Sequence, residues 1–172
     1  GFPRERVLGM AGTLDSSRFR NALAMAAGVT PADVEAITLG SHGDEMAPIV
    51  SQARIKGRPL DIFLSPDKVE ACVRDAITGG GPVVALRKTG SATLAPAHAS
   101  LELIDHIRGA RTGPVPVSVM LQGEYGIDGV VLGVPCHLGK GGLVEVEELK
   151  LTDEELAALK AAAEAIRTRL GM

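Results

Sequence analysis

Aromatic residues are scarce in this 172-residue chain, which contains no tryptophan, one tyrosine and three phenylalanines. The chain is long enough for one domain with a hydrophobic core, and aliphatic side chains must supply most of that core. Few rings are available to stack on nucleic-acid bases. The chain has a net charge of -3 and no basic runs. It therefore lacks the positively charged patch that is typical of DNA- and RNA-binding proteins. We therefore expect no nucleic-acid partner.

Long hydrophobic runs are also missing, because no apolar stretch approaches the roughly 20 residues that a membrane-spanning helix needs. We expect neither a membrane partner nor a signal peptide. The two cysteines, Cys72 and Cys136, have no metal-binding or redox spacing. This cysteine usage suits a reducing compartment, so the expected location is the cytoplasm.

Hydrophobic periodicity and helix-capping residues predict five helices. They cover the segments 15–27, 66–78, 82–88, 95–108 and 153–170. In the fourth of these helices the spacing places Leu101, Ile104 and Ile107 inward. Before the last helix, Thr152 and Glu155 have the spacing of a capping box, in which each side chain pairs with the backbone N–H of the other residue.

Alternating or continuous apolar residues predict strands between the helices. The predicted strand segments are 34–39, 47–55, 115–122, 130–135 and 142–149. Helices interspersed among hairpin-connected strands favour an α+β fold, with a mixed, mostly antiparallel sheet and packed helices, over a parallel doubly wound sheet. In the absence of repeats and low-complexity linkers, residues 1–172 are expected to form a single domain.

The stretch "LDSSRFR", residues 14–20, places a carboxylate and a guanidinium three residues apart. If a helix begins near Asp15, Asp15 and Arg18 project from the same helical face. Such a pair is compatible with a binding site. Spacing alone favours the alternative, an ordinary ion pair at a helix end, which contributes little to stability.

The stretch "LGSHGDEMAP", residues 39–48, places His42 between flexible glycines, directly after a predicted strand. A single histidine in a turn is usually only a polar turn residue, but it is also the side chain best suited to acid–base work at neutral pH. Asp44 has the spacing to cap this turn through its own backbone. The other histidines have no metal-ligand spacing, so no metal site is predicted; they are His98, His106 and His137.

Glycine-rich stretches do not form a recognisable nucleotide-binding loop. Gly79, Gly80 and Gly81 follow a predicted helix, whereas the dinucleotide fingerprint follows a strand and opens a helix. In "GVPCHLGKGG", Gly141 stands where a P-loop requires Ser or Thr after Lys140. The sequence therefore offers no loop of its own for a nucleotide diphosphate.

Four stretches, taken together and in order, resemble the lactate/malate dehydrogenase superfamily. They are "GMAGTLDSSRFRNALA", "GSHGDEMAPIVS", "GGGPVVALRKTGSATLAPAHASLELID" and "GVPCHLGKGGLVEVEELKLTDEEL". The likeness is strongest to the malate dehydrogenases that are similar to lactate dehydrogenase, and it covers essentially the whole chain. It implies that residues 1–172 are the C-terminal catalytic and substrate-binding domain, and that the N-terminal dinucleotide-binding domain is absent. The opening "GFPRERVLGMAG", without an initiator methionine, agrees with this expectation.

The resemblance implies a role for each residue that matches the family motifs. His42 matches the catalytic histidine, and Asp15 matches the aspartate that hydrogen-bonds it. Arg18 matches the arginine that binds the substrate's C1 carboxylate, and Ser91 matches a position lining the substrate and nicotinamide pocket. Arg20 is expected to have a structural role only. The partner of His42 is thus expected to be Asp15, leaving Asp44 to stabilise its turn.

The activity implied by the resemblance is NAD-dependent oxidation of malate to oxaloacetate. NAD would be bound mainly by the absent domain, so the chain alone is expected to be inactive. The implied partners are malate or oxaloacetate, the protein's own N-terminal domain, and further copies in a homo-dimer or tetramer. Two alternatives remain open: a dehydrogenase for L-lactate or another 2-hydroxy acid, and a non-catalytic fragment that associates with itself through an exposed apolar face.

Overall fold

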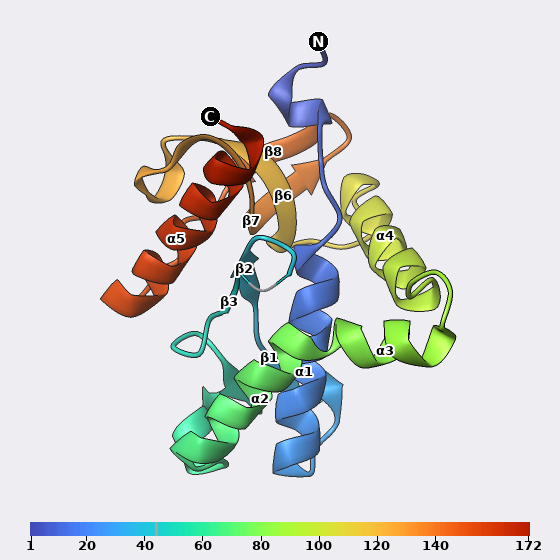
Figure 1. Cartoon of the computed structure of the whole chain (residues 1–172), viewed down its shortest axis with the longest axis vertical. Coiled ribbons are helices and arrows are strands. Elements are labelled where there is room, and N and C mark those ends of the chain that lie inside the picture. The colour runs from blue at the N-terminus through green and yellow to red at the C-terminus, as the bar shows by residue number, and fades with distance from the viewer. Residues whose placement is uncertain (44) are drawn as a thin grey trace.

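The computed structural model describes residues 1–43 and 45–172, so the turn-stabilising role expected of Asp44 lies outside the described residues. Five α-helices occur in this part of the chain (Figure 1). They are α1 (Gly12–Ala27), α2 (Pro66–Thr78), α3 (Gly80–Arg87), α4 (Leu94–Ile107) and α5 (Asp153–Leu170). All five predicted helices are confirmed, with ends that differ by a few residues.

Eight strands form two sheets, and all their pairings are antiparallel across the described residues. The larger sheet has the order β3-β2-β7-β6, with β8 paired to β7, and the smaller sheet has the order β1-β4-β5. The strands are β1 (Val34–Glu35), β2 (Thr38–Gly40), β3 (Met46–Pro48), β4 (Arg54–Ile55), β5 (Arg58–Pro59), β6 (Val115–Gln122), β7 (Asp128–Gly139) and β8 (Gly142–Val146). This mixture of helices and antiparallel sheets confirms the α+β fold.

Two predicted strands each divide between the sheets. Segment 34–39 becomes β1 and β2, and segment 47–55 contributes to β3 and β4. Strand β1 pairs with β4 and β2 pairs with β3, so the two segments run antiparallel, side by side, between the smaller sheet and the larger one. Between the two sheets, the Ile49 N–H donates to the Ile37 carbonyl oxygen at 2.9 Å. An apolar pattern indicates extended backbone but not a change of partner, and for that reason the division was not predicted.

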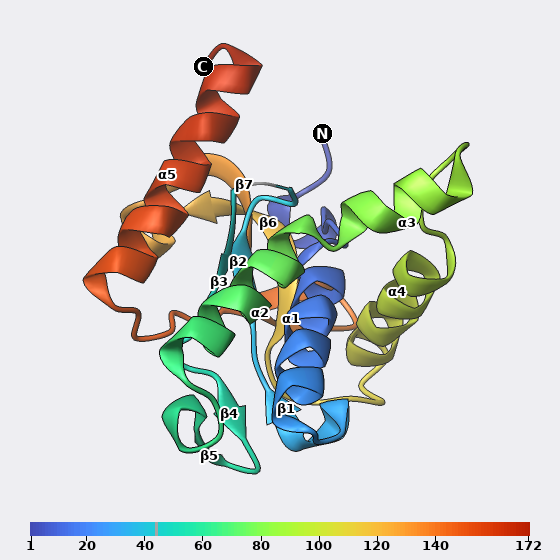
Figure 2. The ribbon, with the colours of Figure 1, turned by 60° about the horizontal axis from the view of Figure 1, so that its bottom comes forward.

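The chain has two hydrophobic cores. The larger lies among β6, β7 and α5 and includes Leu39, Val117, Val119, Leu132, Val134 and Leu159. The smaller lies between α1, α2 and the small sheet and includes Phe19, Leu23, Ile55, Leu64, Cys72 and Ala76. Figures 1 and 2 place α5 on one side of the large sheet and α1, α2 and α4 on the other. Helix α1 thus lies between the two cores.

Helix α4 buries a different face from the one predicted. Leu101 and Ile104 are 59% and 45% exposed, and the buried residues are Ala99, Leu103 and His106. Both stripes have helical spacing, so periodicity alone could not choose between them. The prediction selected the more hydrophobic stripe, which faces outward in this chain.

Burial lowers the pKa of His106, against the opposing effect of the neighbouring Glu102 and Asp105 carboxylates. The unfolded chain therefore binds a proton at a higher pH than the folded chain does. The resulting stability is present above the ordinary histidine pKa of about 6.5 and is lost as the pH falls. We expect the free energy of unfolding to decrease between about pH 7.5 and pH 5.5, with His106 contributing at most about 1.4 kcal/mol per pH unit.

Urea unfolding at several pH values would measure this effect. His106→Gln should flatten the pH dependence, whereas His98→Gln, at an exposed position of the same helix, should leave it unchanged. Equal slopes for wild type and His106→Gln would contradict the assignment.

The predicted capping box of α5 is confirmed. The Glu155 N–H donates to Thr152 Oγ1 at 3.2 Å, and the Thr152 N–H donates to the Glu155 carboxylate at 3.0 Å. The same carboxylate accepts bonds from the backbone and hydroxyl of Ser51, which join the start of α5 to the loop after β3. Within the described part of the chain, none of the helices combines the length and the apolar character that crossing a membrane requires.

Candidate active site

The N-terminus of α1 packs closely against β6. The helix begins at Gly12, earlier than predicted. A Cβ atom at Gly12 would lie 2.9 Å from Pro116 Cβ, which explains the need for glycine. This early start places Asp15 in the first turn, where it is buried, and Arg18 one turn further along the same face.

A tight turn after β2 carries His42. Gly40, the last residue of β2, has φ +91°, a conformation that favours glycine. A Cβ atom at Gly40 would lie 2.9 Å from the carbonyl oxygen of Glu45. The turn leads into β3, which pairs back onto β2. His42 consequently lies beside the first turn of α1.

The imidazole of His42 contacts the carboxylate of Asp15. Nδ1 lies 2.9 Å and 3.1 Å from the two carboxylate oxygens, across 27 residues of sequence. A carboxylate only accepts hydrogen bonds, so we assign the ring proton of neutral His42 to Nδ1 and leave Nε2 as a proton acceptor. The His42 side chain is 52% exposed, while Asp15 is buried. The pair thus combines a fixed buried carboxylate with an accessible imidazole.

Arg18 shares the same carboxylate. Its Nη1 atom lies 3.4 Å from Asp15 Oδ1, so the ion pair considered from the spacing is present. It is longer than the contact between Asp15 and His42. The guanidinium therefore keeps donor capacity for a second anionic partner, because it has five N–H groups in a planar fork.

Two adjoining cavities are both lined by Arg18, His42 and Gly80. One, of about 170 Å³, is also lined by Leu14, Val84, Ser91 and Pro96. The other, of about 370 Å³, is lined by Gly43, Met46, Ile77, Thr78 and Gly81 in addition. Ser91 is exposed at the first cavity. The four residues predicted for the site thus lie close together. Arg18, His42 and Ser91 line the cavities, and the buried Asp15 contacts both Arg18 and His42.

The triple glycine adjoins the guanidinium of Arg18. A Cβ atom at Gly80 would lie 3.5 Å from both Nη1 and Nη2 of Arg18. The absence of a side chain leaves this side of the guanidinium open to the cavities. Gly80 was not predicted as a site residue; its only sequence signal was the run of three glycines at a helix end.

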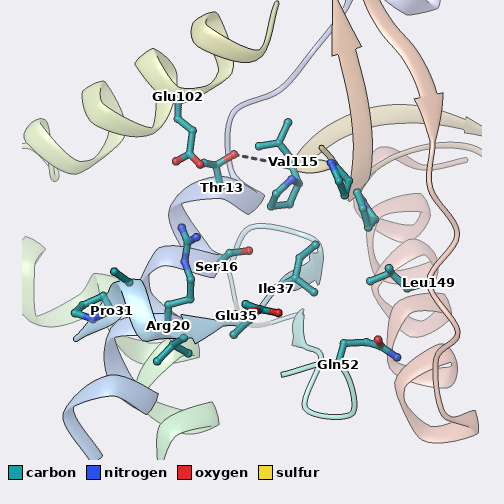
Figure 3. A pocket seen from close by; sticks show the side chains of 16 residues that line it. Thr13, Ser16, Arg20, Pro31, Glu35, Ile37, Gln52, Glu102, Val115 and Leu149 are labelled. Carbon is teal, nitrogen blue, oxygen red and sulfur yellow. Dashed lines mark hydrogen bonds between the residues drawn. The ribbon is translucent and has the colours of Figure 1, made fainter. Parts of the chain in front are cut away.

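A larger cavity, of about 550 Å³, lies elsewhere, between α1, α4 and the start of β6 (Figure 3). Arg20, Glu35 and Glu102 are among its lining residues, and it includes none of the four predicted site residues. Arg20 therefore lies apart from His42 although it follows Arg18 closely in sequence. The residues predicted to act in catalysis and substrate binding therefore lie at the two smaller cavities.

No metal centre occurs among residues 1–43 and 45–172, where no three His, Cys, Asp or Glu side chains come together as ligands. His98 is exposed, and His137 Nε2 lies 2.8 Å from the Glu147 carboxylate. His106 is buried on α4. The cluster at His42 combines an accessible imidazole, a buried carboxylate and a guanidinium, which suits it to moving a proton and binding an anion.

Comparison with known proteins gives a consistent result. Residues 12–171 match the family described as lactate/malate dehydrogenase, alpha/beta C-terminal domain. A malate dehydrogenase of Roseiflexus sp. (strain RS-1) is 44% identical over 170 residues, which cover 99% of this chain and 55% of that protein. The chain thus spans about half the length of the relatives that it matches.

Solved structures extend the comparison. A malate dehydrogenase from Cryptosporidium parvum superposes with a TM-score of 0.94 at 35% identity, covering 98% of this chain and 55% of that one. A lactate dehydrogenase from the same organism, complexed with lactic acid and nicotinamide adenine dinucleotide, superposes with a TM-score of 0.93 at 35% identity and the same coverage. Backbone similarity therefore does not separate malate from lactate as substrate.

Proposed function

Because its residues 12–171 match the C-terminal domain, the chain belongs to the lactate/malate dehydrogenase family, and we propose that it supplies the acid–base and substrate-binding groups of an NAD-dependent malate dehydrogenase. The observation that carries this proposal is the contact of His42 with Asp15, beside Arg18, at the wall of a cavity. The names of the relatives support malate as the substrate. The coverage of those relatives supports a role for residues outside this chain in binding the dinucleotide.

The proposed work of His42 is proton transfer. Reduction of a 2-oxo acid creates negative charge on the carbonyl oxygen, and protonated His42 would donate a proton to it. In malate oxidation, Nε2 of neutral His42 would accept the hydroxyl proton. The Asp15 carboxylate keeps the other proton on Nδ1 and stabilises the positive charge that the ring acquires. The half-exposed ring and buried carboxylate fit this division of work.

The proposed work of Arg18 is to bind the substrate's C1 carboxylate. A guanidinium offers two parallel N–H donors that match a carboxylate in geometry and charge. Gly80 leaves the approach to this fork open. Binding by Arg18 would place the reacting carbon at a fixed distance from His42, and such orientation lowers the barrier substantially.

We propose that this chain contacts the cofactor only at its nicotinamide end. NAD, when bound, would supply the hydride acceptor for malate oxidation. Ser91 and the half-exposed His42 line the same cavity, and we propose that the nicotinamide ring lies beside them. The sequence has no glycine-rich loop for the diphosphate, so we propose that the remainder of the cofactor is bound outside this chain.

Apolar side chains exposed on α3 and α4 favour association. They include Leu86, Leu94, Leu101 and Ile104. Large exposed apolar surfaces usually mark interfaces, and this one supports contact with a dinucleotide-binding domain or with further copies in a dimer or tetramer. We also propose that the protein is located in the cytoplasm. Two other candidates remain: a dehydrogenase for L-lactate, which the second structural comparison supports, and a non-catalytic fragment that self-associates through this face.

Arg18→Lys is expected to lower kcat/KM for oxaloacetate by about 10- to 100-fold, mostly through KM, because charge-assisted hydrogen bonds contribute about 1.5–3 kcal/mol. Lysine keeps the charge but loses the planar fork. Steady-state kinetics would measure the change, with Arg20→Lys as the matched control at the other cavity. Equal losses in both variants would contradict the assignment of Arg18.

The activity itself is tested with the full-length protein, by following NADH oxidation on addition of oxaloacetate or pyruvate. We expect oxaloacetate to be the better substrate. A preference for pyruvate would replace malate by lactate in the proposal. No oxidation with either 2-oxo acid, by a folded protein that binds NADH, would overturn it.

A further inference from the structure

A buried hydrogen bond connects α1 to β2 next to the candidate active site. The Thr38 N–H donates to Ser16 Oγ at 2.9 Å, and both residues are buried. Strand β2 pairs with β7 only at Gly40, through Gly133. At Thr38 the hydroxyl of Ser16 therefore serves as acceptor in place of a strand carbonyl. Figure 3 shows Ser16 on α1 near Ile37, the residue before β2.

This bond lies between the same two segments as the contact between Asp15 and His42. Ser16 directly follows Asp15, and Thr38, the first residue of β2, lies four residues before His42. Among the described residues, the side-chain hydrogen bonds between α1 and the segment 38–43 are these two alone. Ser16 therefore supplies the one side-chain hydrogen bond outside the pair of Asp15 and His42 that joins α1 to the described part of this segment.

The first turn of α1 is fixed on its other side by β6. Thr13 Oγ1 donates to the Pro116 carbonyl oxygen at 2.9 Å, also in a buried position. Gly12 also lies too close to Pro116 to carry a side chain, because a Cβ atom there would lie 2.9 Å from Pro116 Cβ. With this side anchored, the bond from Thr38 to Ser16 joins the other side of the same helical turn to β2, next to Asp15.

We propose, on the basis of the function proposed above, that Ser16 is a positioning residue for proton transfer: by accepting the Thr38 N–H it keeps the Asp15 carboxylate within hydrogen-bond distance of His42 Nδ1. Displacement of a catalytic group by about 1 Å can lower a rate about 100-fold. Arg18 lies on the same helix as Asp15, so its position relative to that helix does not depend on this bond. Ser16 is thus expected to affect the chemical step more than substrate binding.

Ser16→Ala removes the acceptor and leaves the buried Thr38 N–H without one. In the full-length protein we expect kcat for oxaloacetate reduction to fall about 10- to 100-fold, while KM changes by less than about threefold. Thr152→Ala is the matched control, because it also removes a side-chain acceptor of a backbone N–H, in the α5 capping box far from the site in sequence. It should lower the unfolding midpoint without this separation of kcat from KM.

A double-mutant cycle separates positioning from general destabilisation. If Ser16 acts through the pair of Asp15 and His42, Ser16→Ala should cost little further activity, less than about twofold, in the Asp15→Asn background. A merely structural role predicts the same fold loss of kcat in both backgrounds, and that result would overturn the proposal.

The ¹⁵N NMR signals of the His42 ring give a readout that does not require activity. Wild type is expected to show one neutral tautomer, with the proton on Nδ1, and Ser16→Ala a mixture of both. An unchanged single tautomer in Ser16→Ala, together with wild-type kcat, would refute the role of Ser16. If the wild-type protein instead oxidises no NADH with any 2-oxo acid, the proposed function fails, and the NMR result alone then decides whether Ser16 positions the pair.

Discussion

His42→Ala is expected to lower kcat for oxaloacetate reduction by about 100- to 10,000-fold, the usual contribution of a positioned general acid or base. Without the imidazole, the developing alkoxide must take its proton from water. Arg18 and the cavity wall remain in place, so KM should change much less. His98→Ala, which removes an exposed histidine on α4, is the matched control and should keep wild-type kcat.

A loss of less than about tenfold corresponds to less than about 1.4 kcal/mol of transition-state stabilisation. That is too little for a group that transfers the proton. A result of this size, in a folded protein that binds NADH, would remove His42 from the mechanism.

Asp15→Asn is expected to lower kcat on the order of 100-fold, because a charge-assisted hydrogen bond worth about 1.5–3 kcal/mol is lost from the transition state. The substitution preserves shape, but the amide carries no charge to stabilise the imidazolium. Its NH₂ group can also donate to the ring, which favours the tautomer with the proton on Nε2. Nε2 would then be unable to accept the proton of malate.

Asp44→Asn is the comparison that makes this prediction specific. Asp44 is the acidic residue nearest to His42 in sequence, and it is expected only to stabilise the turn. We expect Asp44→Asn to retain kcat within about threefold, less than about 0.7 kcal/mol of transition-state stabilisation, because the proposed proton transfer does not involve its carboxylate. If Asp44→Asn lost more activity than Asp15→Asn, the local pair would be the correct one. Steady-state kinetics of both variants, at matched protein stability, decide between them.

Local patterns predicted much of the secondary structure correctly. The capping box of Thr152 and Glu155 depends on residues three positions apart, and the structure contains both of its hydrogen bonds. Helix α4 shows the limit of such patterns. Its two apolar stripes have the same period, and only the rest of the fold determines which one is buried. The division of segment 34–39 between two sheets has the same cause.

The candidate site depends on contacts between distant segments. Spacing could relate Asp15 to Arg18, because both lie on one helix, but it could not relate Asp15 to His42 across 27 residues. That pairing was expected from the family resemblance, and the structure brings the two side chains into contact; their catalytic roles remain predictions. Gly80 and Ser16 were missed because their importance lies in what touches them: the Arg18 guanidinium and the Thr38 N–H.

Single-turnover kinetics of the full-length protein test the role of His42 most directly, because steady-state kcat often reflects product release rather than chemistry. NADH-loaded wild type and His42→Ala would be mixed rapidly with saturating oxaloacetate, and the first oxidation of NADH followed. We predict equal NADH affinity and a single-turnover rate about 100-fold or more slower in the variant. Equal single-turnover rates would show that His42 transfers no proton in the reaction and would contradict the account.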